Sequence, residues 1–473
     1  MKIKLNNDLL KKIGSIADLG NYEIYVVGGY VRDLLLNKEC KDIDILVVGN
    51  GIEFARLVAE KFRKEVVVYE RFRTALINIK DNKVEFVGAR KESYRSNSRN
   101  PIVKQGTLDD DLARRDFTIN ALAVSLNTKS YGNVVDKFNG LTHLEKGLLR
   151  TPLNPETTFS DDPLRIIRAI RFATVLGFTI DPETFEGIKK SAERIKIITQ
   201  ERITDELLKI LRSPKPSVGF KLLYDAGILK YIFPELLDLG ITNFLIDETE
   251  GKEYHHKNIF LHSLKVMDNI AEKSDNIWLR FAGLVHDIGK PRTRHFDKEA
   301  GWTFHGHDDV GARMMDSIFK KMRLPLDKLD YLKKLVRLHL RPIALVNENV
   351  TDSAIRRLIF EAGEDIFDLM TLCEADITSQ NLLKVEKYRK NYEYVKQRIN
   401  EVEEKDKIRA FQPPVRGDEI INLYNLQPGP VIGKLKTALT DAILDGIIPN
   451  EREEALKFLD NEYKKIQKVQ GII

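Results

Sequence analysis

The spacing of hydrophobic and polar positions divides the chain into two kinds of segment. In the N-terminal part, short apolar runs rich in β-branched residues, some of them alternating with polar positions, are typical of strands. The predicted strands are 24–27, 42–48, 65–69, 74–79 and 83–87, with helical spacing at 51–63 between them. The later part has mostly helical spacing. The pattern predicts an α+β fold, in which a small mixed sheet with helices on one side precedes helical modules.

Two adjacent glycines connect the first strand to a helix, in the sequence Ile24-Tyr-Val-Val-Gly-Gly-Tyr-Val-Arg-Asp. Because glycine has no side chain, the backbone N–H groups at Gly28 and Gly29 can approach an anion closely, and the helix N-terminus adds its dipole. Arg32 offers a guanidinium fork for the same charge. The stretch predicts a binding site for a phosphate chain, although a Gly-Gly pair alone is most often only a turn.

The second strand carries two carboxylates. Its period of two places Asp42 and Asp44 on one face and turns Ile43 and Ile45 into the core. Such oxygens suit Mg²⁺, which prefers oxygen ligands together with substrate phosphates, and the implied chemistry is two-metal nucleotidyl transfer. Two alternating aspartates by themselves are more often a solvated face. Glu85, in a later strand, is either a third carboxylate near the metals or a charge on an edge strand.

Taken together and in this order, these stretches resemble a known motif. Gly28-Gly29-Tyr30-Val31-Arg32-Asp33 with Asp42-Ile43-Asp44 is similar to the first motif of the bacterial-type (class II) CCA-adding tRNA nucleotidyltransferases and their poly(A) polymerase relatives. The resemblance implies a nucleotidyltransferase head of the polymerase-β type. It also implies that Asp42 and Asp44 hold the Mg²⁺ ions and activate the 3′ hydroxyl of the RNA.

Two further stretches continue the resemblance. Segment 90–106 is polar and lacks apolar periodicity, which predicts a mobile loop. In the family, a flexible loop at this place is associated with addition of the final adenosine. Arg114-Arg115-Asp116 matches the second motif, which implies Arg115 on the triphosphate and Asp116 on the ribose. Without that match, the arginines would be read as solvated.

A helix is predicted to start at Asp161-Asp-Pro-Leu-Arg, because proline behind two aspartates marks a helix N-terminus. Four polar residues then recur every three positions, namely Asp162, Arg165, Arg168 and Arg171. An ordinary amphipathic helix explains this stripe without any ligand. A carboxylate and a guanidinium, however, also fit the amine and the ring nitrogen that cytosine and adenine share, whereas guanine and uracil would present a carbonyl to the carboxylate.

The same helix matches the base-templating motif of the family. The resemblance implies that Asp162 and Arg165 pair with the base of CTP or ATP, and that Arg168 and Arg171 lie at the triphosphate. One departure is Asp161, where the family commonly has glutamate. The pairing residues are intact, so the departure concerns only the packing around them.

Histidines gather in the second half of the chain. The sequence Leu284-Val-His-Asp-Ile-Gly-Lys resembles the HD metal-dependent phosphohydrolases. The resemblance implies a divalent transition metal or Mg²⁺ held by His262, His286, Asp287 and Asp376, and His307 and His339 could complete a second site. The corresponding reaction is hydrolysis of a phosphate ester. A lone helical histidine is more often structural.

The resemblance divides the chain into five modules. They are a catalytic head (1–150), a neck with the templating helix (151–215), a helical body and linker (216–250), an HD domain (251–390) and a helical, tRNA-binding tail (391–473). In the tail, Pro428-Gly429-Pro430 before Gly433-Lys434 is either a backbone site for RNA phosphate or an ordinary helix cap.

Composition limits the class of protein. A chain of 473 residues is too long for one core, and 42% hydrophobic and 31% charged residues are typical of a soluble protein. No apolar run is long enough for a membrane span and the first residues lack an export signal, which predicts a cytoplasmic protein. Two cysteines exclude a disulfide framework. A net charge of +5 is too small to indicate a nucleic-acid partner by itself.

The function predicted from the sequence is addition of CCA, from CTP and ATP, to the 3′ end of tRNA. Poly(A) polymerase, A-adding and CC-adding activities stay open, because specialised members of the family share these motifs. A different hypothesis makes the HD module the main activity, a phosphohydrolase on nucleotides or RNA ends, and the head an accessory RNA binder. The intact Asp42, Asp44 and templating stripe argue against it. The sequence indicates no membrane association and identifies no protein partner.

Overall fold

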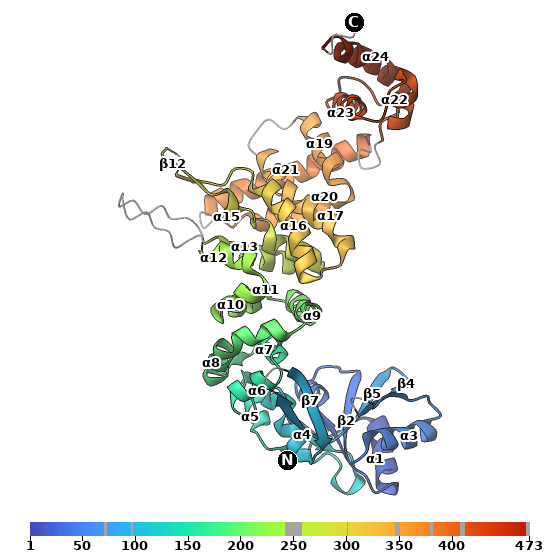
Figure 1. The fold of residues 1–473 in the computed structure, drawn as a ribbon, viewed down its shortest axis with the longest axis vertical. Helices are drawn as coiled ribbons and strands as arrows, with labels where there is room; N and C mark the ends of the chain where they lie inside the picture. The colour runs from blue at the N-terminus through green and yellow to red at the C-terminus, as the bar shows by residue number, and fades with distance from the viewer. Residues whose placement is uncertain are drawn as a thin grey trace. The chain divides into compact units, whose positions relative to one another are not determined.

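A computed structural model of the protein describes residues 1–70, 73–95, 98–241, 258–299, 301–345, 351–378, 382–406 and 412–469. The chain divides into two compact units, Met1–Leu237 and Asp238–Ile473. The first contains a mixed sheet and helices, and the described part of the second consists of helices and a small hairpin (Figure 1). The predicted α+β class, with a mixed-sheet head before a mostly helical remainder, is confirmed. Within the described ranges, no helix has the length and apolar character needed to span a bilayer.

The sheet of the first unit has seven strands in the order β3-β4-β5-β2-β1-β8-β9. Neighbouring strands run antiparallel, except for β2 and β5, which are parallel. The strands are β1 (Glu23–Val27), β2 (Asp42–Val48), β3 (Val67–Tyr69), β4 (Thr74–Ile79), β5 (Asn82–Gly88), β8 (Leu122–Ser125) and β9 (Val134–Asp136). The predicted strands are therefore present, and β2 lies in the interior of the sheet.

Helices α1 (Asp8–Leu19) and α3 (Gly51–Phe62) cover one face of this sheet (Figure 1). Their apolar sides share a core with the buried residues of β2, Ile43 and Ile45 among them. Each helix begins after an asparagine whose side chain accepts two backbone N–H groups, Asn7 for α1 and Asn50 for α3. Because side chains alternate along a strand, Asp42 and Asp44 lie on the opposite face.

The segment predicted as a mobile loop is instead an antiparallel hairpin of β6 (Arg90–Arg95) and β7 (Ser98–Gln105). Its pairing begins at Arg90 with Gln105, and Gly106 follows where a Cβ atom would lie 2.6 Å from the carbonyl carbon of Arg90. The loop prediction was wrong here, because ladder hydrogen bonds are made by the backbone and need no apolar alternation. Residues 96 and 97 lie outside the described part.

The rest of the first unit is mainly helical. Its helices are α2 (Gly29–Leu35), α4 (Leu108–Ala113), α5 (Gly140–Glu145), α6 (Pro155–Asp161), α7 (Leu164–Leu176), α8 (Pro182–Ser191), α9 (Gln200–Leu211), α10 (Ser217–Asp225) and α11 (Leu229–Ile232), and α12 (Pro234–Ile241) spans the division between the units. The two-residue strands β10 (Leu148–Leu149) and β11 (Thr179–Ile180) pair in parallel. The proline at residue 163 precedes α7, so the predicted helix start is confirmed, although Asp161 ends α6.

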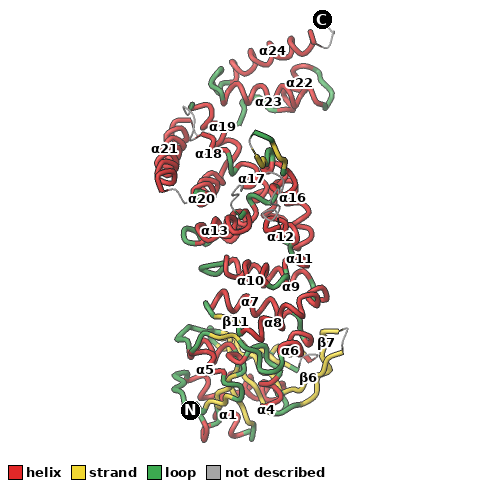
Figure 2. Tube along the Cα trace, turned by 90° about the vertical axis from the view of Figure 1, so that its left-hand side faces the viewer, coloured by secondary structure: helices red, strands yellow, loops and turns green. Residues whose placement is uncertain are grey.

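The described part of the second unit is mostly helical, and Figure 2 draws its helices in red. The helices are α13 (Ile259–Ala271), α14 (Ile277–Val285), α15 (Lys290–Thr293), α16 (His307–Met322), α17 (Leu329–Leu338), α18 (Arg341–Leu345), α19 (Asp352–Ala362), α20 (Ile366–Asp376), α21 (Leu382–Asp406), α22 (Gly417–Tyr424), α23 (Pro430–Leu444) and α24 (Arg452–Val469). Helices α22 to α24 have a small core of their own. The predicted linker lies mostly outside the described residues, which omit 242–257.

Candidate nucleotide and metal sites

Three carboxylates lie together on the sheet face opposite α1 and α3. The parallel register of β2 and β5 sets Asp44 beside Glu85, and Asp42 is two residues before Asp44 on the same face. The pKa of Asp44 is raised, mainly by burial. The charge of Arg115 lowers this pKa in part, and the charge of Asp42 raises it further. Burial, and next the charge of Asp44, raise the pKa of Glu85. A cluster of carboxylates in which Asp44 and Glu85 have raised pKa values favours a divalent cation, so the residues fit a magnesium site.

Glu85 is not on an edge strand. Its strand, β5, lies between β4 and β2 in the sheet, and the residue is half-buried. Of the two possibilities left open by the sequence, the structure therefore favours a carboxylate beside Asp44.

Arg115 reaches these carboxylates across the glycine turn. Gly28 has a φ of 73° and caps α2, in the left-handed region that favours glycine. A Cβ atom at Gly28 would lie 2.7 Å from Nη1 of Arg115 and 3.7 Å from Oδ2 of Asp44. The missing side chain thus leaves the space in which the guanidinium lies. Arg115 lies beside the glycine turn and close to Asp44, where a triphosphate was expected.

Asp111, to which no sequence motif pointed, holds Arg115 in this position. Its fully buried carboxylate accepts hydrogen bonds from Nη2 and Nε of Arg115 at 3.1 and 3.3 Å, and from Nε of Arg114 at 2.9 Å. Burial would raise the pKa of Asp111, but the two arginines outweigh it and lower the pKa. The spacing of four residues between Asp111 and Arg115 is the signal that could have identified the pair.

Replacing Asp111 by asparagine is expected to lower the free energy of unfolding by about 3 kcal/mol, because it leaves two largely buried arginines without their carboxylate. Urea unfolding followed by circular dichroism measures the change. The matched control is Asp109→Asn on the same helix, whose ion pair with Lys137 is exposed and should matter by less than about 1 kcal/mol. Equal losses in the two variants would show that the buried pairing has no special role.

Asp116 and Arg168 bind each other. Nη2 and Nε of Arg168 donate to Oδ2 of Asp116 at 2.6 and 2.9 Å, and Nδ2 of Asn120 donates to Oδ1 at 3.0 Å. Burial would raise the pKa of Asp116, but Arg168 and Asn120 outweigh it and lower the pKa to about 2. The residues expected on the ribose and on the triphosphate are therefore ion-paired with each other, and their roles toward a nucleotide stay predictions.

Three arginines from two of the motifs lie around Phe172. The guanidinium carbons of Arg32, Arg168 and Arg171 lie 5.0, 5.3 and 3.9 Å from its ring centroid. Arg32 also pairs with Asp33 and donates to Oδ1 of Asn120 at 2.8 Å. Arg171 pairs with Glu206 of α9, a partner that no motif indicated. The structure thus brings the predicted phosphate-binding arginines together, each with a carboxylate partner inside the protein.

The predicted templating pair lies at the start of α7. Oδ1 of Asp162 accepts the backbone N–H of Leu164 at 3.1 Å, so the half-buried aspartate also caps the helix. Arg165 is 9% exposed and donates from Nη2 to the backbone oxygen of Arg114 at 2.7 Å. This bond connects the templating helix to the segment that carries Arg115.

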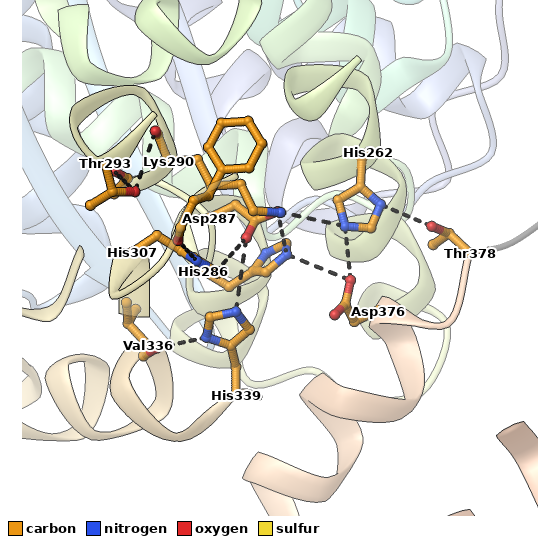
Figure 3. Close-up of polar contacts among 12 residues, drawn as sticks. His262, His286, Asp287, Lys290, Thr293, His307, Val336, His339, Asp376 and Thr378 are labelled. Atoms are coloured by element: carbon orange, nitrogen blue, oxygen red, sulfur yellow. Dashed lines mark hydrogen bonds and ion pairs between the residues drawn. The ribbon is translucent and has the colours of Figure 1, made fainter. Parts of the chain in front are cut away.

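In the second unit, the predicted metal ligands converge from five helices (Figure 3). His262 lies in α13, His286 and Asp287 follow α14, His307 begins α16, His339 follows α17 and Asp376 ends α20. We call these six side chains the HD cluster. Their ligand atoms form two groups, each within 4.8 Å, which are His262, His286 and Asp376, and Asp287, His307 and His339.

Asp287 lies between the two groups. Its Oδ2 is 3.2 Å from Nε2 of His286, and its Oδ1 is 3.3 Å from Nε2 of His307 and 3.8 Å from that of His339. In the first group, Nε2 of His262 is 2.8 Å from Oδ1 of Asp376. The carboxylate of Asp287 therefore faces the histidines of both groups. His307 and His339, which could form a second metal site, would share it with the first.

The hydrogen bonds of the histidines leave their Nε2 atoms directed at the cluster centre. In three of them Nδ1 lies next to a backbone carbonyl, which can only accept, so Nδ1 carries the proton. The pairs are His286 with Gly283 (2.9 Å), His307 with Phe304 (2.8 Å) and His339 with Val336 (2.7 Å). Among the described residues, their Nε2 atoms are buried and make no hydrogen bond of good geometry, although oxygens of Asp287 lie 3.2 to 3.8 Å away. Such nitrogens fit a metal ion, which would take the lone pairs.

The charges of the cluster also fit a cation. Burial alone would lower the pKa of His286, but Asp287 and Asp376 outweigh it and raise the pKa to about 9. Burial, and next the charge of His286, lower the pKa of His339 to about 4. Lys290 donates to Oδ2 of Asp287 at 2.7 Å. A divalent metal would supply the positive charge that a proton on His286 otherwise provides.

Three family models match the chain. The model described as the poly A polymerase head domain matches residues 24–150, the probable RNA and SrmB-binding site of polymerase A matches 177–239, and the HD domain matches 259–362. The carboxylates and Arg115 lie within the first match. His262, His286, Asp287, His307 and His339 lie within the third, and Asp376 follows it.

Relatives with known functions cover most of the chain. An A-adding tRNA nucleotidyltransferase of Deinococcus radiodurans is 32% identical over 73% of this chain and 77% of its own length. A CC-adding tRNA nucleotidyltransferase of Thermus thermophilus is 29% identical over 92% of this chain and 93% of its own. The solved CCA-adding enzyme of Thermotoga maritima, in complex with tRNA, shares the fold with a TM-score of 0.60 at 22% identity, over 96% of this chain and 95% of that one.

Proposed function

Because this chain belongs to the family of tRNA nucleotidyltransferases, we propose that it completes the 3′ end of tRNA with CCA, using CTP and ATP. The observation that carries the proposal is the group formed by Asp42, Asp44 and Arg115 at the glycine turn, in which carboxylates for a metal and a cation for a triphosphate lie side by side. We also propose a cytoplasmic location, which a function on tRNA ends supports.

In the reaction, the 3′ oxygen of tRNA forms a bond to the α-phosphorus of the nucleotide as the bond to pyrophosphate breaks. Mg²⁺ bound by Asp42 and Asp44 would neutralise the charge that develops on the phosphates and make the 3′ hydroxyl more acidic. Arg115, fixed by Asp111, is positioned to hold the triphosphate over Gly28. Glu85, beside Asp44, would support the same metal site.

Complete CCA addition is the activity that we propose, in preference to A-only, CC-only or poly(A) addition. The use of both CTP and ATP is supported by Asp162 and Arg165, whose carboxylate and guanidinium suit both cytosine and adenine. The experiment that tests it uses three tRNA transcripts, ending before the CCA, after C and after CC. With labelled CTP and ATP, we expect the first transcript to gain C, C and A in that order. Addition should then stop. Growth beyond CCA would indicate poly(A) synthesis, and arrest after the second C or failure on the first transcript would indicate a specialised enzyme.

Replacing Asp162 by alanine should weaken the rejection of UTP and GTP while CTP and ATP use falls. A site that hydrogen-bonds its substrate rejects wrong partners by roughly 10⁴-fold or more, and one lost pairing should remove about 1 to 3 kcal/mol of this. The measurement is relative incorporation of all four nucleotides on one tRNA acceptor. Glu156→Ala, which removes an exposed acid from the preceding helix, serves as control and should keep the wild-type ratios. If Asp162→Ala lowered the incorporation of all four nucleotides in proportion, the polar stripe would be only the polar face of an amphipathic helix and would not select the base.

A second activity is proposed for the HD cluster, namely hydrolysis of a phosphate ester. It is supported by the buried Nε2 atoms of His286, His307 and His339, which lack hydrogen-bond partners within the described residues and point toward one centre. Four imidazoles with two carboxylates suit a divalent transition metal, which would activate water and polarise the phosphoryl group. In hydrolysis, a bond forms from water oxygen to phosphorus, the ester P–O bond breaks, and the leaving oxygen takes up a proton.

A further inference from the structure

A short β-hairpin connects two parts of the HD cluster in the sequence. Its strands β12 (His295–Asp297) and β13 (Gly301–Thr303) pair antiparallel, and in sequence they lie between the cluster residues Asp287 and His307. The segments before and after the hairpin each make a hydrogen bond with a residue of the HD cluster. On one side Lys290 donates to Asp287, and on the other the carbonyl of Phe304 accepts from Nδ1 of His307. What binds along the hairpin is therefore held close to the cluster.

The hairpin carries an indole stacked with a guanidinium. Trp302 pairs across the strands with Phe296, their ring centroids 5.0 Å apart at 68°, and the guanidinium carbon of Arg294 lies 3.6 Å from the indole centroid. Both rings are only partly buried. Cross-strand aromatic pairs also stabilise hairpins, which accounts for the contact between the two rings. The guanidinium makes a cation–π contact with the indole, and the two aromatic rings stay partly exposed a few residues from the HD cluster.

The charge around the rings is positive. From 290 to 305, lysine and arginine occur at four positions, Lys290, Arg292, Arg294 and Lys298, against the two acids Asp297 and Glu299. Exposed His295 and His305 add donors. Aromatic rings among cations are the elements by which proteins bind single-stranded nucleic acid, with bases on the rings and phosphates on the cations.

We infer that this hairpin binds the last nucleotides of a single-stranded RNA end, with one base stacked on Trp302 and the terminal phosphate at the HD cluster. The inference rests on the phosphohydrolase activity proposed above and names its substrate as an RNA end in place of a phosphate ester in general. The reach is sufficient, since His307 is the fifth residue after Trp302 and a fully extended chain of five residues spans at most about 18 Å. A short oligonucleotide covers this distance.

The first experiment detects the base on the ring. The chain has two tryptophans, and Trp278 packs against Phe281 and Phe319 in the helical core. In the full-length Trp278→Phe variant the fluorescence comes from Trp302 alone. Titration with a trinucleotide that ends in a 3′-phosphate should quench it, whereas the same titration of Trp302→Phe, which reports on Trp278, should change nothing. An unchanged Trp302 signal at RNA concentrations that saturate binding by calorimetry would overturn the inference.

The second experiment separates substrate binding from support of the cluster. With Mg²⁺, Mn²⁺, Co²⁺ or Ni²⁺ in turn, wild type and Trp302→Ala are compared on the trinucleotide 3′-phosphate and on glycerol phosphate, which has no base. A loss of about tenfold or more in kcat/KM is expected on the trinucleotide only, and Trp302→Tyr should restore it. Equal losses on both substrates would mean that the hairpin merely supports the cluster, and the inference would fail.

The two experiments distinguish the inference from the activity on which it rests. Quenching of Trp302 without hydrolysis of either substrate by the wild type would refute the phosphohydrolase proposal and leave RNA binding by the hairpin standing. Hydrolysis of both substrates without quenching would refute the hairpin site and leave the phosphohydrolase proposal standing.

Discussion

Replacing Asp44 by asparagine is expected to slow nucleotide addition by roughly 10³-fold or more, because phosphoryl transfer depends on cations that neutralise developing charge and asparagine removes the charged ligand with little change in volume. Asp42→Asn should act in the same direction. The measurement is single-turnover incorporation of labelled CTP on a tRNA that ends before the CCA. Affinity for that tRNA should stay near the wild-type value, since the change affects a metal site and not a phosphate-binding surface.

The stability of the Asp44→Asn variant provides an independent check. Burial raises the pKa of Asp44, so its ionised form opposes folding at pH values above the normal range of a carboxyl, and its neutral replacement should not lower the thermal midpoint at pH 7. Mg²⁺ should raise the midpoint of the wild type and have little effect on the variant. Asp81→Asn, at the exposed turn between β4 and β5, is the matched control and should behave as wild type in every assay. Full activity in the Asp42→Asn, Asp44→Asn double variant would remove the carboxylates from the proposed mechanism.

Loss of the HD cluster should abolish phosphate-ester hydrolysis and leave nucleotide addition intact. In the variant that combines His286→Ala with Asp287→Asn, both groups of the cluster lose a ligand, because the oxygens of Asp287 face each of them. Removing part of a metal site should lower hydrolysis by roughly 10³-fold or more, since the metal supplies the activated water. Elemental analysis should show that the purified variant has lost its divalent metal, and labelled CTP and ATP should still be added to tRNA.

His305→Ala is the matched control for this variant. His305 is exposed and lies two residues before His307, so its removal tests the loss of an imidazole near the cluster without the loss of a ligand. Metal content and hydrolysis of glycerol phosphate, which has no base for the hairpin to bind, should stay unchanged in it. If a folded cluster variant lost hydrolysis and nucleotide addition together, the two activities would not belong to separate units, and the assignment of the head as an independent catalytic module would be wrong.

Several features of the head follow from local sequence alone. The strand, glycine turn and helix around Gly28 follow from short-range sterics, because only glycine adopts the positive φ of that turn without strain. The alternation in β2 put Asp42 and Asp44 on one face and the isoleucines in the core. The start of α7 after the proline at 163 was likewise readable. Each of these depends on residues within a few positions of one another, and the structure confirms each element.

The tertiary structure decided how distant segments meet. The parallel pairing of β2 with β5 brought Glu85 beside Asp44, and no local pattern specifies that register. The burial of Asp111 under Arg115 and the position of Asp287 between two groups of histidines arise only when several elements pack together. The hairpin of β6 and β7 was missed because its hydrogen bonds belong to the backbone, which carries no side-chain signal. Local steric preferences act over a few residues, whereas these sites are assembled by strand pairing and core burial between segments far apart in the chain. The sequence therefore identified the chemical groups. Only the tertiary structure determined which of these groups share a site.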